Sequence, residues 1–183
     1  MNMHFNLKTS LIVAALMALP VAQAATMSKA DYKAAKTRIS ADYKADKAAC
    51  ASMTANAKDI CIEEAKAKEK IARAEAEYSY TGKPKDQTTL MQVKAKSAYA
   101  VAKEKCDDKT GNDKDVCVKE AKAVETKALA DAKMGKQIGE AKTEASEDKR
   151  DADYKLAVAK CDAMTGDAKT SCLAAAKVKF GKN

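Results

Sequence analysis

The segment that decides the fold lies at residues 106–117 and reads CDDKTGNDKDVC. Near-copies with the same cysteine spacing are CASMTANAKDIC at residues 50–61 and CDAMTGDAKTSC at residues 161–172. The first cysteine of each copy follows that of the previous copy by 56 or 55 residues. A fixed period of this length indicates a threefold internal repeat in which each copy forms one supersecondary unit.

The middle of each copy contains a helix stop followed at once by a helix start. Ala55, Gly111 and Gly166 stand where a left-handed residue ends a helix, a conformation that glycine adopts without steric cost. The next residue has a side chain that accepts hydrogen bonds from the free amides of a new helix. We therefore predict helix caps at Asn56, Asn112 and Asp167.

A stop and a start at this spacing predict an antiparallel helical hairpin with one cysteine on each helix. The two cysteines then face each other about one turn from the bend. An even number of cysteines at repeated spacing in an exported chain favours disulfides over metal ligands or reactive thiols. The predicted pairs are Cys50 with Cys61, Cys106 with Cys117, and Cys161 with Cys172.

A tyrosine stands seven residues before the first cysteine of each copy, at Tyr43, Tyr99 and Tyr154. Seven residues are two helical turns, so each tyrosine shares a face with its cysteine. We predict that the three tyrosines pack in the hairpin seams. The alternative is a row of aromatic contacts for a ligand such as a glycan, although an aromatic residue at helical spacing is more often part of the core.

The predicted fold class is all-α, with three tandem antiparallel hairpins and therefore six helices, elongated or loosely stacked. Large apolar side chains are few while alanine and lysine, both good helix formers, are abundant, so we expect small interfaces and a monomer. The units are residues 25–80, 81–134 and 135–183. Gly82 and Pro84 mark the first boundary, whereas residues 135–139 form either a loop or part of one continuous helix.

The first 24 residues have the pattern of a cleaved secretory signal peptide. They contain Lys8, an apolar run at residues 11–19 and a small-x-small motif that predicts cleavage after Ala24. The alternative, a membrane anchor, needs about 20 apolar residues, and this run is shorter. We expect a periplasmic or secreted protein without a transmembrane segment after cleavage.

The net charge of +8 falls to +7 without the signal peptide, because Lys8 is its one charged side chain. This balance favours anionic polymers or membrane surfaces as partners. The charge is spread evenly along the chain, and lysines alternate with acidic residues. A specific nucleic-acid site usually concentrates its basic residues among base-reading groups. We therefore expect a solvated charged surface and no specific nucleic-acid partner.

Most catalytic and metal-binding motifs are missing from the sequence. The single histidine, His4, is lost with the signal peptide, which excludes histidine-based triads and Cys/His zinc sites. Four-cysteine zinc would need thiolates from different hairpins, and the acidic residues near 107–115 lack the pattern of an EF-hand. We expect no catalytic residue, no metal, no cofactor and no enzymatic activity.

Residues 56–61, NAKDIC, and 113–122, DKDVCVKEAK, together with the Ala-Gln-Ala signal cleavage motif, resemble a group of small exported Ala/Lys-rich proteins of proteobacteria, largely uncharacterised. The resemblance covers the repeats. It implies a location in the periplasm or cell envelope and repeated cysteine-paired helices. It brings no catalytic residues.

Two functional hypotheses follow from these observations. The first is a noncatalytic envelope protein that acts as a spacer or as a weak binder of anionic envelope material. The alternative is a periplasmic chaperone-like protein that binds unfolded clients through exposed methionine and tyrosine side chains. Added salt separates the two hypotheses, because it weakens polyanion binding but not the capture of apolar segments.

Overall fold

The structure is a computed structural model that describes residues 27–182. In this range the protein is all-α, as predicted. Its helices are α1 (Lys29–Ala49), α2 (Ala55–Thr81), α3 (Pro84–Cys106), α4 (Gly111–Asp162) and α5 (Gly166–Phe180), with a short 3₁₀ turn, η1 (Cys50–Ser52), after α1. The predicted signal peptide at 1–24, its cleavage site and His4 lie outside the described residues.

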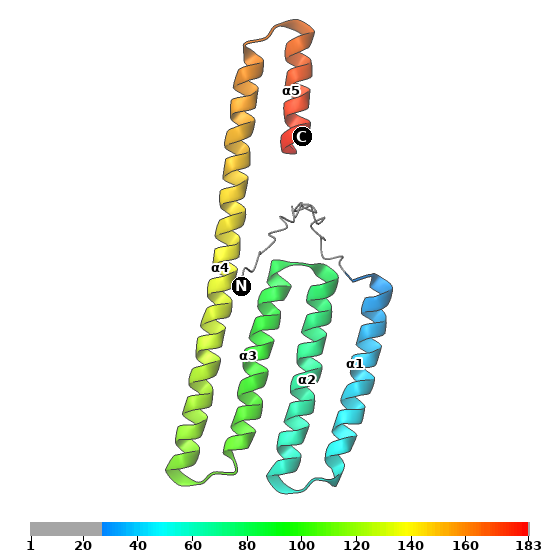
Figure 1. The fold of residues 1–183 in the computed structure, drawn as a ribbon, viewed down its shortest axis with the longest axis vertical. Helices are drawn as coiled ribbons and strands as arrows, with labels where there is room; N and C mark the ends of the chain where they lie inside the picture. Colours follow the sequence, from blue (N-terminus) through cyan, green and yellow to red (C-terminus); the bar gives the residue numbers. More distant parts are fainter. Residues whose placement is uncertain (1–26, 183) are drawn as a thin grey trace, which may run out of the picture.

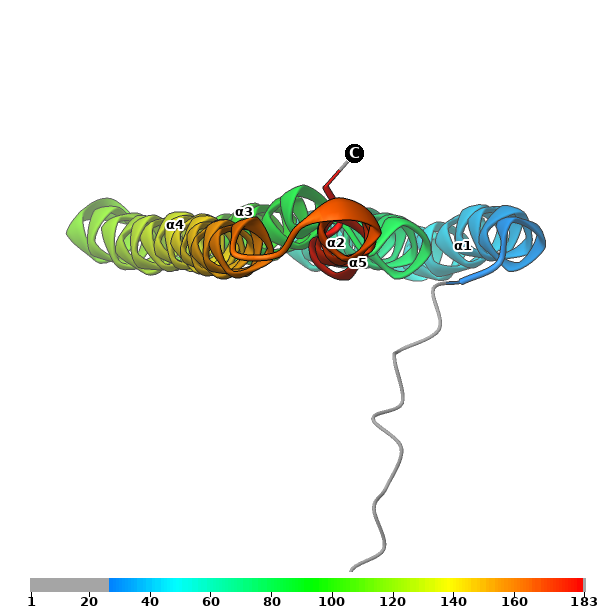
Figure 2. The same ribbon diagram turned by 90° about the horizontal axis from the view of Figure 1, so that it is seen from above.

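The helices lie side by side in one layer (Figures 1 and 2). Helices α1 to α4 alternate in direction, and each contacts its neighbour in the chain. Helix α4 continues far beyond the ends of α1, α2 and α3, and α5 folds back along this distal part. Because the helices form one layer, both faces of the layer are exposed to solvent.

The prediction of six helices is wrong, since the part of the chain that the structure describes contains five α-helices. The second and third units share α4, which has 52 residues and is therefore about 78 Å long. It runs without a break through Gly135 and Gly139, where a loop was the alternative. Each glycine weakens a helix by about 1 kcal/mol, and the surrounding alanine, lysine and glutamate residues outweigh this cost.

The three bends between the paired cysteines have one geometry. In each bend the amide three residues after the first cysteine donates to that cysteine's carbonyl: Met53 to Cys50 at 3.1 Å, Lys109 to Cys106 at 3.0 Å and Met164 to Cys161 at 3.0 Å. A threonine with extended backbone and a left-handed residue then begin the second helix. The left-handed residues are Ala55 (φ 50°), Gly111 (φ 56°) and Gly166 (φ 56°).

The prediction of helix caps at Asn56, Asn112 and Asp167 is wrong. The cap positions are occupied by Thr54, Thr110 and Thr165, none of which forms a side-chain cap hydrogen bond. The extended threonine and the left-handed residue after it turn the chain early, so the predicted caps already lie inside the helix. The Asn56 amide instead donates to the Glu104 carbonyl at 2.9 Å and links α2 to the end of α3.

Each bend is closed by the predicted disulfide, and no described cysteine is free. The Cα–Cα distances are 5.7 Å for Cys50–Cys61, 5.7 Å for Cys106–Cys117 and 5.6 Å for Cys161–Cys172. The first cysteine of every pair is almost fully buried. Apart from these, the buried apolar residues of the described chain are Ile39 and alanines: Ala35, Ala65, Ala76, Ala95, Ala132 and Ala176.

The hairpins differ in what supports them besides the disulfide. At the open end of the first hairpin, Tyr32 stacks on Tyr80 with ring centroids 4.6 Å apart, and the Met27 amide donates to the Ser79 carbonyl. Ile39 and Ala35 pack against Ala76 between them. In the third hairpin, α5 has an edge contact between Tyr154 and Phe180 and an ion pair from Lys182 to Asp151. Consequently α5 depends most on its disulfide.

No helix within residues 27–182 combines the length and apolar character needed to span a membrane. The three disulfides fit a compartment outside the reducing cytosol.

We predict that the double variant Cys161→Ala, Cys172→Ala releases α5 from α4. A disulfide that closes so short a loop contributes about 3 kcal/mol in the chain-entropy account, and few other contacts hold this hairpin. Hydrogen exchange should show loss of amide protection across residues 166–180. The matched variant Cys50→Ala, Cys61→Ala should retain protection in α1, because the tyrosine stack and Ile39 remain. Equal loss of protection in both variants would contradict this assignment.

We also predict that Ala55→Gly stabilises the first bend by about 1 kcal/mol, because an L-residue with a side chain is strained in the left-handed region. The reverse change, Gly111→Ala, should destabilise the second bend by a similar amount. Although an added Cβ at Gly111 meets no atom within 4 Å, its φ of +56° makes the substitution unfavourable. Thermal unfolding followed by circular dichroism should give midpoint shifts of opposite sign.

Candidate polyanion-binding surface

Each of the first four helices carries a row of basic side chains along one side. In α2, Lys66, Lys70 and Arg73 are spaced by four and three residues, which places them on one side of the helix. Spacings of 3, 7 or 11 residues, close to whole turns, do the same in the other helices. Their rows are Lys36 and Lys47 in α1, Lys85, Lys96 and Lys103 in α3, and Lys119, Lys122 and Lys133 in α4.

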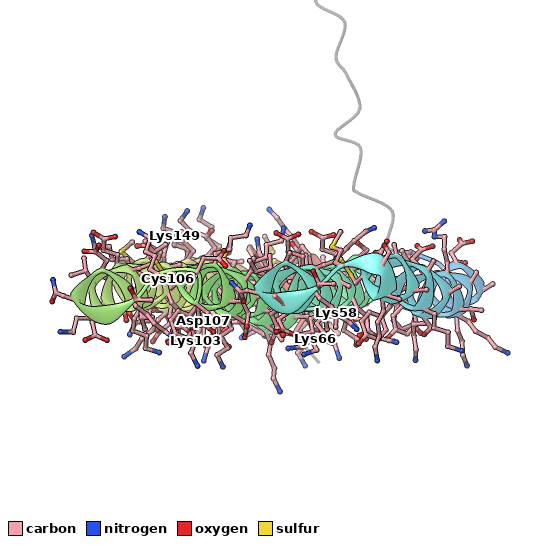
Figure 3. The ribbon with its side chains drawn as sticks, turned by 90° about the horizontal axis from the view of Figure 1, so that it is seen from below. Lys58, Lys66, Lys103, Cys106, Asp107 and Lys149 are labelled. Carbon is pink, nitrogen blue, oxygen red and sulfur yellow. A yellow bond between two sulfur atoms is a disulfide. The ribbon has the colours of Figure 1, made fainter. Side chains whose placement is uncertain are left out.

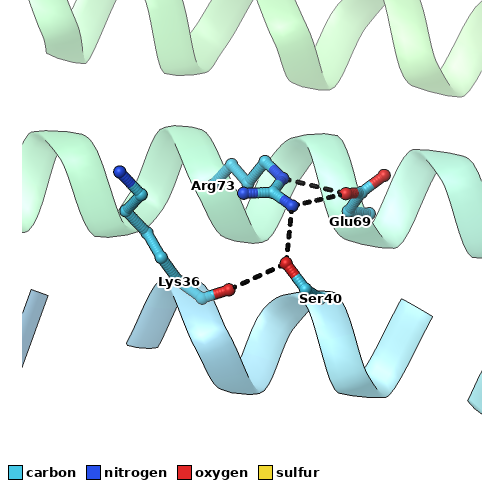
Figure 4. A network of polar contacts seen from close by, with 4 residues as sticks. All are labelled: Lys36, Ser40, Glu69 and Arg73. Atoms are coloured by element: carbon cyan, nitrogen blue, oxygen red, sulfur yellow. Dashed lines mark hydrogen bonds and ion pairs between the residues drawn. The ribbon is translucent and has the colours of Figure 1, made fainter. Parts of the chain in front are cut away.

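Contacts between neighbouring helices bring the rows of α1 and α2 to the same face of the layer. The Arg73 guanidinium donates to the Ser40 hydroxyl at 2.9 Å and also pairs with Glu69 (Figure 4). The Ser40 hydroxyl donates in turn to the carbonyl of Lys36, which lies one turn earlier in α1. Lys36 and Arg73 therefore belong to one continuous surface across the α1–α2 seam.

The rows of α3 and α4 join the same face. Figure 3 shows Lys66 of α2 and Lys103 of α3 on one side of the layer, and Lys149 of α4 on the other. The Lys122 ammonium lies 4.9 Å from the centre of the Tyr99 ring. Tyr99 stands one turn from both Lys96 and Lys103, so this cation–π contact connects the rows of α3 and α4. We call the eleven residues of the four rows the basic face.

The opposite face of the layer has a mixed charge. Its lysines on α3 pair with acidic residues of α2 across the seam: Lys94 with Glu75 at 2.8 Å and Lys105 with Glu64 at 2.7 Å. On the basic face Lys66, Arg73 and Lys122 pair with carboxylates of their own helices. The other members of the basic face form no ion pair with the described residues. The two faces therefore differ in charge although their lysines are equally common in sequence.

Two of the paired lysines hold their protons more strongly than a free lysine. The Glu63 carboxylate, which accepts a hydrogen bond from Lys66, raises the pKa of the Lys66 ammonium. The Glu125 carboxylate does the same for the pKa of Lys122, at an Nζ–Oε2 distance of 2.6 Å. Glu125 is almost fully buried in the α3–α4 seam. Both cations thus keep their charge throughout the neutral pH range.

The three tyrosines singled out by their spacing lie at the seams of their own hairpins, each half-buried. Tyr43 lines a small hollow between α1 and α2, and Tyr99 lines a largely apolar one between α3 and α4. Tyr154 contacts Phe180 across the α4–α5 seam. Because the three seams are successive, the tyrosines do not converge on one site.

The structure does not assemble a metal site from the residues it describes: no cluster of three or more histidine, cysteine, aspartate or glutamate side chains is placed to hold an ion. All six cysteines are consumed in disulfides, so no thiolate remains to bind zinc. The chemistry offered by the described surface is that of fixed positive charges.

Sequence reasoning missed the basic face and the buried Glu125. Charge counted along the chain is even, because lysines of both faces and acidic residues of one face follow each other within each helix. The spacing of Lys66, Lys70 and Arg73 is visible in the sequence. Its meaning depends on the single layer, which aligns the rows of different helices.

Comparison with known proteins finds no matching protein-family model, no matching curated protein and no matching solved structure. The resemblance to exported cysteine-repeat proteins is therefore carried by the sequence motifs alone.

We predict that Glu125→Gln lowers the pKa of Lys122, because the variant loses the carboxylate that stabilises the protonated amine. Titration of the lysine side chains by NMR should show the change at Lys122. Lys66 serves as the internal control, since its partner Glu63 is unaltered. An unchanged Lys122 pKa would show that the Glu125 pair is not formed in solution.

Proposed function

We propose that the mature protein is a noncatalytic protein of the periplasm or cell envelope that binds anionic envelope polymers through the basic face. The observation that carries the proposal is the segregation of charge between the two faces of the layer. On the opposite face, lysines are neutralised by Glu64 and Glu75, while most lysines of the basic face form no ion pair with described residues.

The flat form of the layer supports an extended ligand. The basic rows run parallel along α1, α2, α3 and α4, so a linear polyanion can cross several rows at once. Each exposed contact between a lysine and an anionic group is weak, and salt screens it. Affinity then comes from many such contacts, which matches a ligand with repeated charges better than a small molecule.

The disulfides and the predicted signal peptide support an envelope location. Disulfides persist in the periplasm and outside the cell. The long α4 also gives the protein the reach of a spacer, since its distal part extends well past the layer. Binding at the basic face and separation through α4 are compatible roles.

A chaperone-like role is the second candidate, and one observation favours it. Several large apolar side chains are exposed, among them Met53, Met91, Met134, Leu156 and Met164. They lie on different segments of the chain and do not form one patch along a single helix. Client capture would therefore be weak, and it would persist when salt is added.

The test compares two triple variants of equal net charge. Lys70→Gln, Lys96→Gln, Lys103→Gln removes three charges from the basic face, and Lys94→Gln, Lys105→Gln, Lys149→Gln removes three from the opposite face. With heparin as the linear polyanionic probe, the first variant should bind about tenfold or more weakly, and its salt dependence should fall by about two units of slope. The second should remain within about twofold of the native protein.

Equal weakening in both variants would show that binding follows net charge alone and would overturn the role of the basic face. Absence of heparin binding by the oxidised native protein would reject polyanion binding. An unfolded, reduced protein used as the probe at low and high salt separates the chaperone-like alternative, because its capture should not weaken with salt.

A further inference from the structure

The outer side of α1 is apolar although nothing in the described chain covers it. Ala30, Ala34, Thr37 and Ala41 follow each other at spacings of four, three and four residues, so they form one exposed stripe. The stripe lies opposite Ala35 and Ile39, the buried residues that α1 packs against α2. It lines a shallow hollow at the edge of the layer. Helix α1 thus has two apolar sides, and the layer uses one of them.

Helix α5 also has an uncovered apolar side. Ser171, Ala174 and Val178 are spaced by three and four residues, opposite the buried Ala176 and the half-buried Leu173. Val178 is 84% exposed, the highest fraction among the large apolar side chains described as exposed. Small residues with one large exposed side chain suit close packing against another alanine-rich helix.

The outline of the molecule places these two stripes so that a second copy covers both. Helix α5 lies beside the distal part of α4, beyond the ends of α1 and α2, so the outline has a step (Figure 1). The uncovered sides of α1 and α5 both face away from α4. A twofold rotation perpendicular to the layer fits the step of one copy into that of the other and sets each α1 beside the partner's α5.

The direction of the helices agrees with this arrangement. Helices α1 and α5 run the same way along the layer, so the rotation makes α1 antiparallel to the partner's α5. Every neighbouring pair inside the layer is antiparallel as well, which favours opposed helix dipoles. The stripe of α1 from Ala30 to Ala41 and the α5 segment from Asp167 to Val178 each span 11 residues, so they match in length.

Charges at the ends of the two stripes are partly complementary. In the antiparallel pair, Asp167 at the start of α5 lies towards Lys44 and Lys47 in the last part of α1. Val178, near the end of α5, lies towards Ala30 and Ala34. We propose that the protein forms a closed, twofold-symmetric dimer in which α1 of each copy packs on α5 of the other. This inference is independent of the proposed polyanion binding.

A second copy could be added in another way, by packing α1 on the outer side of α4, where Val116 and Met134 are exposed. Such contacts use two different surfaces and produce an open row of molecules. They leave Val178 uncovered, whereas the twofold arrangement covers both stripes and closes. The sequence predicted a monomer from the small number of large apolar side chains, and the same scarcity implies a dimer that dissociates on dilution.

The test is sedimentation of the oxidised chain 25–183 over roughly 1 to 500 µM, which spans weak to moderate affinities. The native chain should pass from monomer to dimer and stop there. Ala34→Lys and Val178→Lys should each weaken dimerisation about tenfold or more, because each places a cation in an apolar contact next to the partner's basic residues. Met134→Lys on the outer side of α4 is the matched control and should leave the dimer unchanged.

A compensating pair tests the contact itself. Ala34→Glu combined with Val178→Lys should dimerise more tightly than Val178→Lys alone, since the two side chains meet across both copies of the interface. Circular dichroism of each variant checks that the helices are retained. A monomer at every concentration, or growth beyond the dimer that Met134→Lys abolishes, would overturn the proposal.

Discussion

The structure depends on the sulfur–sulfur bond that closes each of its three bends. The first cysteine of each pair is almost fully buried, in seams where nearly every other buried residue is alanine. An alanine buries little apolar area and so contributes little to the free energy of folding. A disulfide acts differently, because it restricts the unfolded chain and needs no large core. The bonds therefore supply the pairing of helices that bulky side chains supply in most helical proteins.

Alanine seams and disulfides together explain why the helices form one layer. Small side chains let neighbouring helices approach closely, but they provide no second apolar surface on which another layer can pack. Each helix therefore exposes two sides to solvent, and charged residues occupy both. Without a second layer, the described chain forms only small or shallow hollows, and the surface carries its recognition chemistry in the pattern of charge. The difference between the basic face and the opposite face is thus a direct consequence of the missing core.

The cysteine spacing was sufficient to predict the hairpins and the three disulfide pairs, because a disulfide inside a short loop leaves few geometries open. The caps were less predictable. Asn56, Asn112 and Asp167 have the right side chains, yet the left-handed backbone at the preceding residue starts the helix early. The continuity of α4 depends on a sum of small propensities over 52 residues, in which two glycines are outweighed. The basic face depends on the alignment of four helices, which no local pattern contains.

A single layer of helices has two edges, and their chemistry constrains how the protein can associate. An uncovered apolar edge invites another copy, as the edge strand of a sheet does. Surfaces that differ between the two edges would permit unlimited addition, whereas a symmetric pairing uses its own surfaces fully and stops. The length of α4 is what makes the symmetric solution available, because it carries α5 past the ends of α1 and α2 and creates the step. The same unbroken helix that departs from the expected loop therefore sets the shape of the molecule, and through that shape it determines which edges can meet.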